Sequence, residues 1–142
     1  MNPLSCRRRP VLGLFVSHLE GPYQQHFWRG FDTFCREFDC DLIVYSSRFY
    51  PNEQTGNERV REAVYRLADK SRIDGLCVDS SAFSSESSFL DFIAQASGLS
   101  YIPVIASSMD TPLFPSVVPD NEGGIRELVT HLVSEHHCKR IC

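Results

Sequence analysis

The stretch VLGLFVSHLEGPYQQHFWRGFDTFCREFDCDLIVYSS, residues 11–47, decides the fold. It opens with a nearly unbroken apolar run from Val11 to Val16. Such a run is typical of a parallel strand that helices cover on both faces. Pro22 then suits the first turn of a helix, and a second apolar run at 42–45 predicts the next strand. The stretch therefore indicates one β-α-β unit.

Aromatic spacing gives the helix of this unit its predicted buried face. Phe27, Phe31, Phe34 and Phe38 recur at steps of four, three and four residues. This spacing places all four rings on one side of a helix. We expect that side to pack against the sheet, and we do not interpret it as a cofactor site.

The same alternation of strand and helix continues to the end of the sequence. Strands are predicted at 73–78, at 102–106 and, briefly, at 117–118, and Gly98 is placed to end a helix. The expected buried stripes of the later helices are Val60, Ala63, Val64, Leu67 and Ala68; Phe89, Phe92, Ile93 and Ala96; and Ile125, Leu128, Val129, Leu132 and Val133. Residues 139–142 are predicted to begin another strand. The pattern predicts an α/β fold, an open parallel sheet with helices on both faces, in a Rossmann-like arrangement.

Size and composition predict one soluble domain. The 142 residues suffice for a single core. The formal net charge of −4 leaves Arg7–Arg9 as the only basic cluster, so binding to nucleic acid is not expected. Polar residues interrupt the first apolar run too early for a signal peptide or a membrane span, which favours a cytoplasmic location. The six cysteines are expected to be reduced, with Cys35 and Cys77 in the core.

Polar residues follow each predicted strand, and ligands of open parallel sheets bind beyond the carboxyl ends of the strands. Hydroxyl and carboxylate groups there suit a small polyhydroxylated ligand. The same residue types also cap helices and form turns, and that interpretation stays open. The predicted ligand contacts are Ser17, Glu20, Tyr23, Ser47, Asp79, Ser80, Ser107 and Asp120.

Asp120 has a second interpretation, because it precedes a predicted helix. It is well placed as the N-cap, with Glu122 in the first turn near the positive end of the helix dipole. Gly123 and Gly124 resemble a phosphate loop only superficially, since neither a G-x-G-x-x-G motif nor a Gly-Lys-Ser/Thr motif is present. We therefore predict a helix start at this position.

Catalysis and metal binding are both disfavoured. His18 and Glu20 are the best acid–base pair, with Asp79 to orient the imidazole, but no nucleophile elbow accompanies them. Residues 136–138, His-His-Cys, are adjacent and cannot easily turn three side chains onto one ion. We predict no catalytic residue, no metal site and no cofactor.

Several stretches of the sequence resemble a known protein family. The stretch at 11–47 looks like the opening of LacI-type effector-binding domains, which are similar to periplasmic binding proteins. The segments IDGLCVDSS, IPVIASS and PSVVPDNEGGIRELVTHLVSEHHCKRI are similar to later parts of those domains in the same order. The segment FPSVVPDNEGGIRELVTHLVSEHHCKRI most resembles LacI-type sensors that precede GGDEF diguanylate cyclase, histidine kinase or AraC-type output domains. The resemblance covers residues 10–142.

The resemblance implies one lobe of a two-lobed, type I periplasmic-binding-protein fold with a ligand between the lobes. Residues 1–9 would then be an N-terminal tail, and 10–142 the N-terminal lobe, ending at the crossover to the second lobe. A second lobe and an output domain are implied partners, and a homodimer through the outer helices is typical of the family.

Two departures from the family stand out. Too few residues precede Val11 for a helix-turn-helix, so direct binding of nucleic acid by this chain is not expected. His137 stands where the family usually has a glycine that ends a helix, and a left-handed residue with a side chain there would cost about 1 kcal/mol.

Three hypotheses follow. The leading one is a sensory domain that binds a small, polar, sugar-like metabolite, makes no membrane contact, and controls a signalling or transcriptional output. The second is the effector domain of a DNA-binding transcription regulator. The third is a small flavodoxin-like enzyme, which the same alternation of strands and helices permits.

Overall fold

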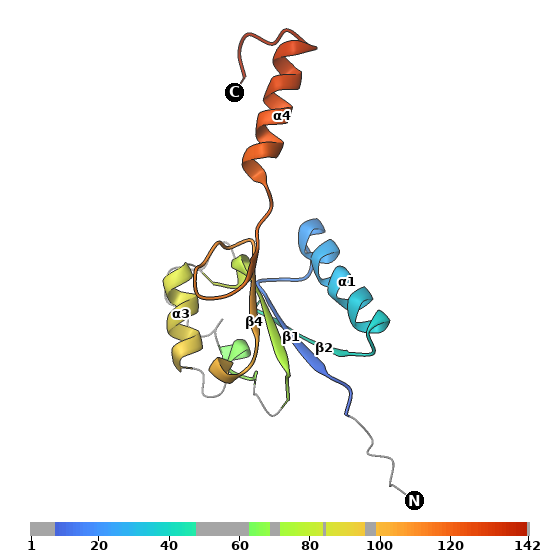
Figure 1. The fold of residues 1–142 in the computed structure, drawn as a ribbon, viewed down its shortest axis with the longest axis vertical. Coiled ribbons are helices and arrows are strands. Elements are labelled where there is room, and N and C mark those ends of the chain that lie inside the picture. The colour runs from blue at the N-terminus through green and yellow to red at the C-terminus, as the bar shows by residue number, and fades with distance from the viewer. Residues whose placement is uncertain (1–7, 48–62, 69–71, 84, 96–98, 142) are drawn as a thin grey trace, which may run out of the picture.

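The fold was analysed in a computed structural model, which describes residues 8–47, 63–68, 72–83, 85–95 and 99–141. Strands and helices alternate along the chain, as the sequence predicts (Figure 1). The strands are β1 (Val11–Val16), β2 (Asp41–Ser46), β3 (Gly75–Asp79), β4 (Val104–Ser107) and β5 (Ser116–Val117). The helices are α1 (Pro22–Glu37), α3 (Glu86–Gln95) and α4 (Asn121–Ser134), with 3-10 turns η1 (Ser80–Ala82) and η2 (Leu99–Tyr101).

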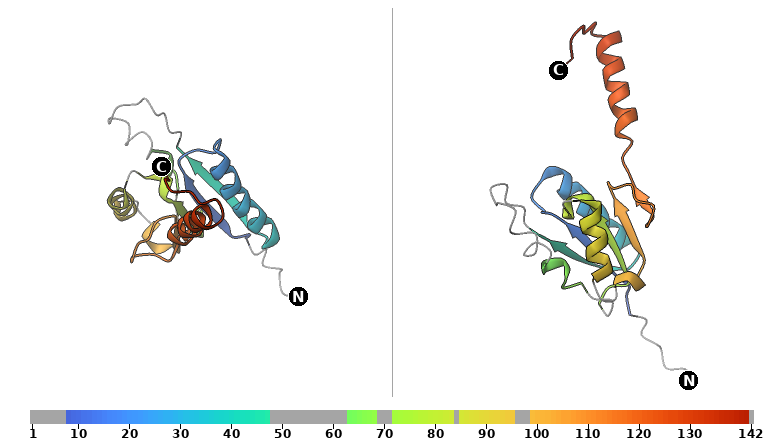
Figure 2. Two further views of the ribbon diagram at one scale, coloured as in Figure 1. Left: turned by 90° about the horizontal axis from the view of Figure 1, so that it is seen from above. Right: turned by 90° about the vertical axis from the view of Figure 1, so that its left-hand side faces the viewer.

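The five strands form one parallel sheet in the order β2-β1-β3-β4-β5. Seen from above, α1 and α3 lie on opposite sides of this sheet (Figure 2). The α/β class, the parallel sheet and the helices on both faces are therefore confirmed. Parallel strands present their carboxyl ends at a common edge, which is where this fold binds ligands.

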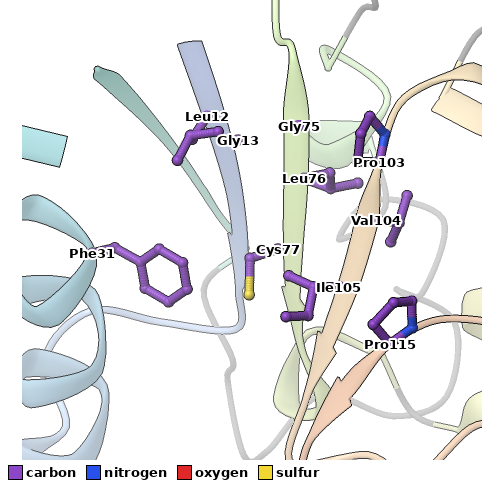
Figure 3. Close-up of a pocket in the computed structure, with 10 residues that line it drawn as sticks. All are labelled: Leu12, Gly13, Phe31, Gly75, Leu76, Cys77, Pro103, Val104, Ile105 and Pro115. Carbon is purple, nitrogen blue, oxygen red and sulfur yellow. The ribbon is translucent and has the colours of Figure 1, made fainter. Parts of the chain in front are cut away.

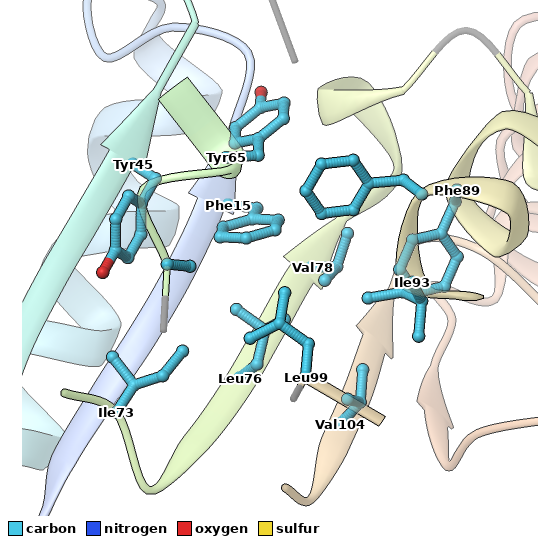
Figure 4. Close-up of a cluster of buried hydrophobic side chains, with 12 residues drawn as sticks. Phe15, Tyr45, Tyr65, Ile73, Leu76, Val78, Phe89, Ile93, Leu99 and Val104 are labelled. Carbon is cyan, nitrogen blue, oxygen red and sulfur yellow. The ribbon is translucent and has the colours of Figure 1, made fainter. Parts of the chain in front are cut away.

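The two faces of the sheet carry separate apolar clusters. On the face of α3, Phe15 stacks on Tyr65 (Figure 4), with ring centroids 4.6 Å apart. Phe92 meets Phe15 edge-on, with ring centroids 5.9 Å apart. On the face of α1, Leu14 and Cys77 pack with Val16 beneath the helix. Because neighbouring residues of a strand point to opposite faces, the apolar run of β1 supplies both clusters.

The buried side of α1 differs from the prediction. Phe27 and Phe31 pack against the sheet, but the side chains of Phe34 and Phe38 are 45% and 59% exposed. These two rings stack on each other with centroids 4.4 Å apart. The helix is turned so that Cys35, and not Phe34, meets the sheet. Phe38 already lies beyond the helix, as its C-cap.

The predicted second helix is described only in part. Residues 63–65 are helical, and Val60 lies outside the described residues. Within the described part, Tyr65 is fully buried, whereas Leu67 is 66% exposed and Ala63 is also exposed. The predicted stripe is therefore wrong at Leu67 and Ala63, because Tyr65 turns toward the core instead. Gly98 also lies outside the described residues.

Helix α4 forms where predicted, and Asp120 caps it by accepting a hydrogen bond from the amide of Gly123 at 2.8 Å. The helix projects away from the sheet (Figures 1 and 2). Its apolar stripe is consequently not packed on the lobe, and Ile125 is 60% exposed. The predicted burial of this stripe is wrong for the residues that the structure describes.

The turn after α4 contains His137 with a backbone φ of 48°. This left-handed conformation is the one that a helix-ending glycine would adopt, and here a residue with a side chain adopts it. Residues 139–141 are not a strand, contrary to prediction. A strand takes its hydrogen bonds from a neighbouring strand, and residues 139–141 follow a helix that points away from the sheet.

The described part of the N-terminal segment is tied to the sheet. Arg8 pairs with Asp74 at 3.0 Å, and Arg9 pairs with Asp39 and Asp41. The backbone amide of Val11 donates to Asp74 at 2.8 Å, and this bond, together with Arg8, lowers the pKa of the Asp74 carboxyl. These two arginines therefore form ion pairs with carboxylates of the same domain.

Candidate functional site

Buried polar side chains gather at the edge formed by the carboxyl ends of the strands. Among the described residues, the buried polar or charged ones are Ser17, Ser47, Asp79, Ser107 and Thr111. Each is the last residue of a strand or lies in the segment that follows one. Polar groups are costly to bury unless they are satisfied. Their concentration at this edge therefore marks it as the candidate site.

Asp79 is the central residue of the site. It ends β3, beside Ser107 of β4, and its side chain is only 1% exposed. The Oδ2 atom accepts hydrogen bonds from the amide and the hydroxyl of Ser81, in the turn η1. The Oδ1 atom has no hydrogen-bond partner among the described residues. A buried carboxylate oxygen left without a hydrogen bond is costly to the fold, so a donor that reached Oδ1 would be bound strongly.

A chain of hydrogen bonds runs from Asp79 toward α1. The Ser17 hydroxyl donates to the Ser81 hydroxyl at 3.0 Å, and Nδ1 of His18 lies 2.8 Å from the Ser17 oxygen. Asp79 is thus connected to His18 through two serines and not by direct contact. The expectation that Asp79 orients the imidazole is not met in this geometry.

A cavity of about 320 Å³ opens at this edge. Its lining residues are Tyr23, Asp79, Ser80, Ser81, Ser108, Val118, Pro119 and Asn121. The Tyr23 hydroxyl lies 3.0 Å from the Ser108 hydroxyl, which links the start of α1 to the segment after β4. Ser108 has a backbone φ of 59°, a strained conformation for a residue with a side chain. Such strain is often found at binding sites.

Four of the eight predicted contacts belong to this cavity or its hydrogen-bond network: Ser17, Tyr23, Asp79 and Ser80. Ser107 pairs with Asp79 in the sheet. Sequence reasoning did not select Ser81, Ser108 or Asn121, although each neighbours a predicted strand end. No sequence signal separates them from other loop residues, because their positions depend on the turn η1 and on the left-handed Ser108.

The other predicted contacts have different surroundings. The Ser47 hydroxyl lies 2.7 Å from that of Tyr65, which donates to the carbonyl of Val16 at 2.9 Å, so Ser47 belongs to a buried structural network. Glu20 is exposed, and its carboxylate accepts a hydrogen bond from the amide of Leu19. Asp120 caps α4, and a Cβ at Gly123 would collide with its carboxylate. Gly123 thus serves the cap.

A second cavity, of about 300 Å³, was not anticipated from the sequence. It lies where the sheet meets the edge of α1, and Figure 3 shows the Phe31 ring facing Cys77 of β3. Its lining is apolar, with Ile105 of β4 and Pro115 among its walls. Burial, and to a lesser degree Asp79, raises the pKa of the Cys77 thiol to about 12, so the thiol stays neutral. Its apolar walls provide contacts that do not select for a particular polar group.

Two further observations concern the described residues taken together. In its described part, no helix is long and apolar enough to cross a membrane. The same residues contain no group of three or more His, Cys, Asp or Glu side chains arranged to hold a metal ion.

Comparisons with known proteins link this fold to transcription regulators. No family model matches the sequence, and no curated protein matches it. The Cra transcriptional dual regulator from Pseudomonas putida, solved in complex with fructose 1-phosphate, is 25% identical with a TM-score of 0.60. The lac repressor dimer bound to operator and the anti-inducer ONPF is 19% identical with a TM-score of 0.66.

The matches cover most of this chain but a minority of each neighbour. They span 87% of the chain and 42% of the Cra regulator, and 92% of the chain and 37% of the lac repressor. The first neighbour is named a transcriptional dual regulator, and the second a repressor bound to operator. The chain has the fold of a lobe of LacI-type regulators, which are similar to periplasmic binding proteins.

Proposed function

We propose that this chain is the sensory lobe of a cytoplasmic regulator and binds a small, polar, sugar-like metabolite at the carboxyl edge of its sheet. The observation that carries the proposal is Asp79, a fully buried carboxylate in the wall of the edge cavity, with Oδ1 lacking a partner among the described residues. A ligand hydroxyl would supply the missing hydrogen bond.

The ligands of the structural neighbours agree with this proposal. The Cra regulator holds fructose 1-phosphate, and the lac repressor holds the anti-inducer ONPF. Because the chain spans about two fifths of those proteins, its ligand, second lobe and output remain proposals. The predicted contacts Glu20, Ser47, Ser107 and Asp120 stay candidates for a closed, ligand-bound form.

The geometry also suggests how binding is transmitted. Val118, Pro119 and Asn121 line the cavity and join the sheet to α4, so a ligand there touches the connection to the helix. The exposed apolar stripe of α4 is a suitable surface for packing inside a second lobe. A ligand that contacts both lobes would favour their closed arrangement through its higher affinity for that state.

The first test measures binding. We expect neutral sugars at millimolar concentration to raise the midpoint of thermal unfolding, because a ligand that binds only the native state stabilises it. In Asp79→Ala this shift should disappear while the chain stays folded. Ser87→Ala, an exposed change on α3, is the matched control. An equal shift in Asp79→Ala would remove Asp79 from the site.

A transcriptional output is the second candidate, because both structural neighbours are regulators of transcription. The coding sequence on either side of residues 1–142 separates the two outputs. A helix-turn-helix segment would favour a transcription regulator, whereas a GGDEF or histidine kinase segment would favour a signalling protein.

A homodimer is part of the proposal. The lac repressor neighbour is a dimer, and the stacked rings of Phe34 and Phe38 form an exposed aromatic pair on α1. We expect Phe34→Ser with Phe38→Ser to shift the chain toward monomer in sedimentation velocity. Leu113→Ser, an exposed apolar residue outside α1, is the control. A wild-type chain that is monomeric at all concentrations would contradict the dimer.

A further inference from the structure

We infer that the cavity at Asp79 selects a ligand group that donates a hydrogen bond and carries no negative charge, a hydroxyl or an ammonium, and that it rejects phosphate esters. The inference rests on the proposed function of this cavity. It separates this chain from its neighbour that holds fructose 1-phosphate.

The Asp79 carboxylate uses its two oxygens differently. Both donors of Ser81 that reach the carboxylate are directed at Oδ2. Oδ1 is buried and without a partner among the described residues. An ionised carboxylate accepts hydrogen bonds and cannot donate them. A ligand that contacts Oδ1 must therefore present an O–H or N–H group.

The protons along the hydrogen-bond chain can each be assigned to a donor. The Ser81 hydroxyl donates its one proton to Asp79, and the Ser17 hydroxyl donates its proton to Ser81. The contact between Ser17 and Nδ1 of His18 therefore needs its proton from the imidazole. Every proton in this chain points toward Asp79. The free positions on Ser17 and Ser81 are lone pairs, so this hydrogen-bond chain offers a ligand acceptors and no spare donor.

The electrostatics of the cavity also disfavour a phosphate. The described lining of the cavity contains hydroxyl groups, one amide and one carboxylate, and no lysine or arginine. A phosphate placed there would meet the negative charge of Asp79 in a partly desolvated site without a cation to offset the repulsion. A hydroxyl satisfies Oδ1 without adding charge, and an ammonium also neutralises the carboxylate.

The test uses three probes that differ only at carbon 1: fructose, 1-amino-1-deoxyfructose and fructose 1-phosphate. Each is titrated into the 15N-labelled chain, and the amide signals of Ser80 and Ser81 are followed by NMR. We expect fructose or its amino analogue to shift these signals, with affinity at least roughly tenfold above that for fructose 1-phosphate. The arm that binds more tightly identifies the donor as hydroxyl or ammonium.

Two variants assign the selectivity to Asp79. Asp79→Asn should lose most of the discrimination against fructose 1-phosphate, because the negative charge is removed and the shape is kept. Asp91→Asn, which neutralises an exposed carboxylate on α3, should keep it. Discrimination that survives in Asp79→Asn would overturn the role of Asp79.

The remaining outcomes separate this inference from the proposed function. Fructose 1-phosphate that binds the wild-type chain as tightly as fructose would overturn the selectivity and leave the cavity a sugar site. If none of the three probes shifted any signal at the cavity, the proposed function would fail and the inference with it.

Discussion

Two cavities of nearly equal size, about 300 and 320 Å³, lie along the same strand and differ in almost every chemical respect. Cys77 lines the apolar cavity and Asp79 lines the polar one. These residues are two positions apart in β3, so both side chains leave the same face of the sheet. The apolar cavity is a gap in packing, whereas the polar cavity contains a buried acceptor without a described partner.

Size alone therefore does not identify a binding site. Both faces of a parallel sheet are normally covered, and the apolar cavity lies where cover by α1 ends. Filling that cavity would add apolar contact that depends little on the identity of the group. In the polar cavity, a group beside Oδ1 of Asp79 would be favoured when it donates a hydrogen bond. Of these two cavities, the polar one is therefore better suited to distinguish one small polar molecule from another.

The largest expected effect is on the reactivity of the Cys77 thiol, which lines the apolar cavity. The pKa of the Cys77 thiol is raised to about 12 from its ordinary value of 9.0. At pH 8 the thiolate fraction of Cys77 should therefore be about a thousandfold lower in the folded chain than in the unfolded one. A pulse of iodoacetamide, analysed by peptide mass spectrometry with and without urea, measures this ratio.

The same shift has a consequence for stability. A raised thiol pKa favours folding at pH values below 9.0, and that contribution is lost as the pH rises from 9.0 toward 12. Replacing Cys77 with valine should remove this alkaline loss. Native labelling of Cys77 within tenfold of the unfolded rate would show that the apolar cavity opens readily, and the contrast with the polar cavity would weaken.

The next largest effect concerns the packing beside the apolar cavity. Leu14 is fully buried and packs with Cys77, and Phe31 of α1 contacts the same cluster. Leu14→Ala should lower the free energy of unfolding by about 2–5 kcal/mol, as measured by urea denaturation. Ile105→Ala is the control, because Ile105 is already partly exposed at the cavity wall. Equal losses in the two variants would contradict this division.

A smaller effect is expected where buried polar groups at the strand edge serve structure. The Tyr65 hydroxyl bonds to the carbonyl of Val16 and to Ser47. Tyr65→Phe should cost about 1–2 kcal/mol in unfolding free energy, with no change in the preference among the three fructose probes. Tyr101→Phe, at an exposed tyrosine, is the control. A change in probe preference would place Tyr65 and Ser47 within the binding network.

The fold could be predicted from sequence because hydropathy records which strands are covered on both faces. β1 was predicted with its observed limits, Val11–Val16. The other strands are shifted by one or two residues, since polar residues such as Asp41 and Ser107 pair through backbone bonds to their neighbours. The hydropathy of a residue does not indicate whether its backbone makes those bonds. It also cannot show that α4 forms an apolar stripe without covering this sheet.

The position of the candidate site was easier to predict than the residues that form it. The rule for open parallel sheets located it at the carboxyl edge, and Asp79, Ser80 and Tyr23 lie in its cavity. The role of Ser47 was not predictable, because it depends on Tyr65, eighteen residues away. Ser81 was not selected because its role arises from the turn η1, which directs its amide and hydroxyl back to Asp79.

The smallest expected effect is also the one that links binding to stability. Asp79 stabilises the turn η1 through Ser81, but its buried Oδ1, which has no hydrogen-bond partner among the described residues, opposes folding. In Asp79→Asn the amide oxygen can keep the bonds to Ser81 while the buried charge disappears. The free energy of unfolding should then rise by about 1 kcal/mol, as measured by urea denaturation at pH 7. Asp91→Asn, at an exposed position, should change it by less than about 0.5 kcal/mol.

A gain in stability together with lost ligand selectivity is expected of a residue kept for binding. A loss as large as that of Tyr65→Phe would instead make Asp79 a structural residue, and the contrast between the two cavities would no longer be one between packing and recognition.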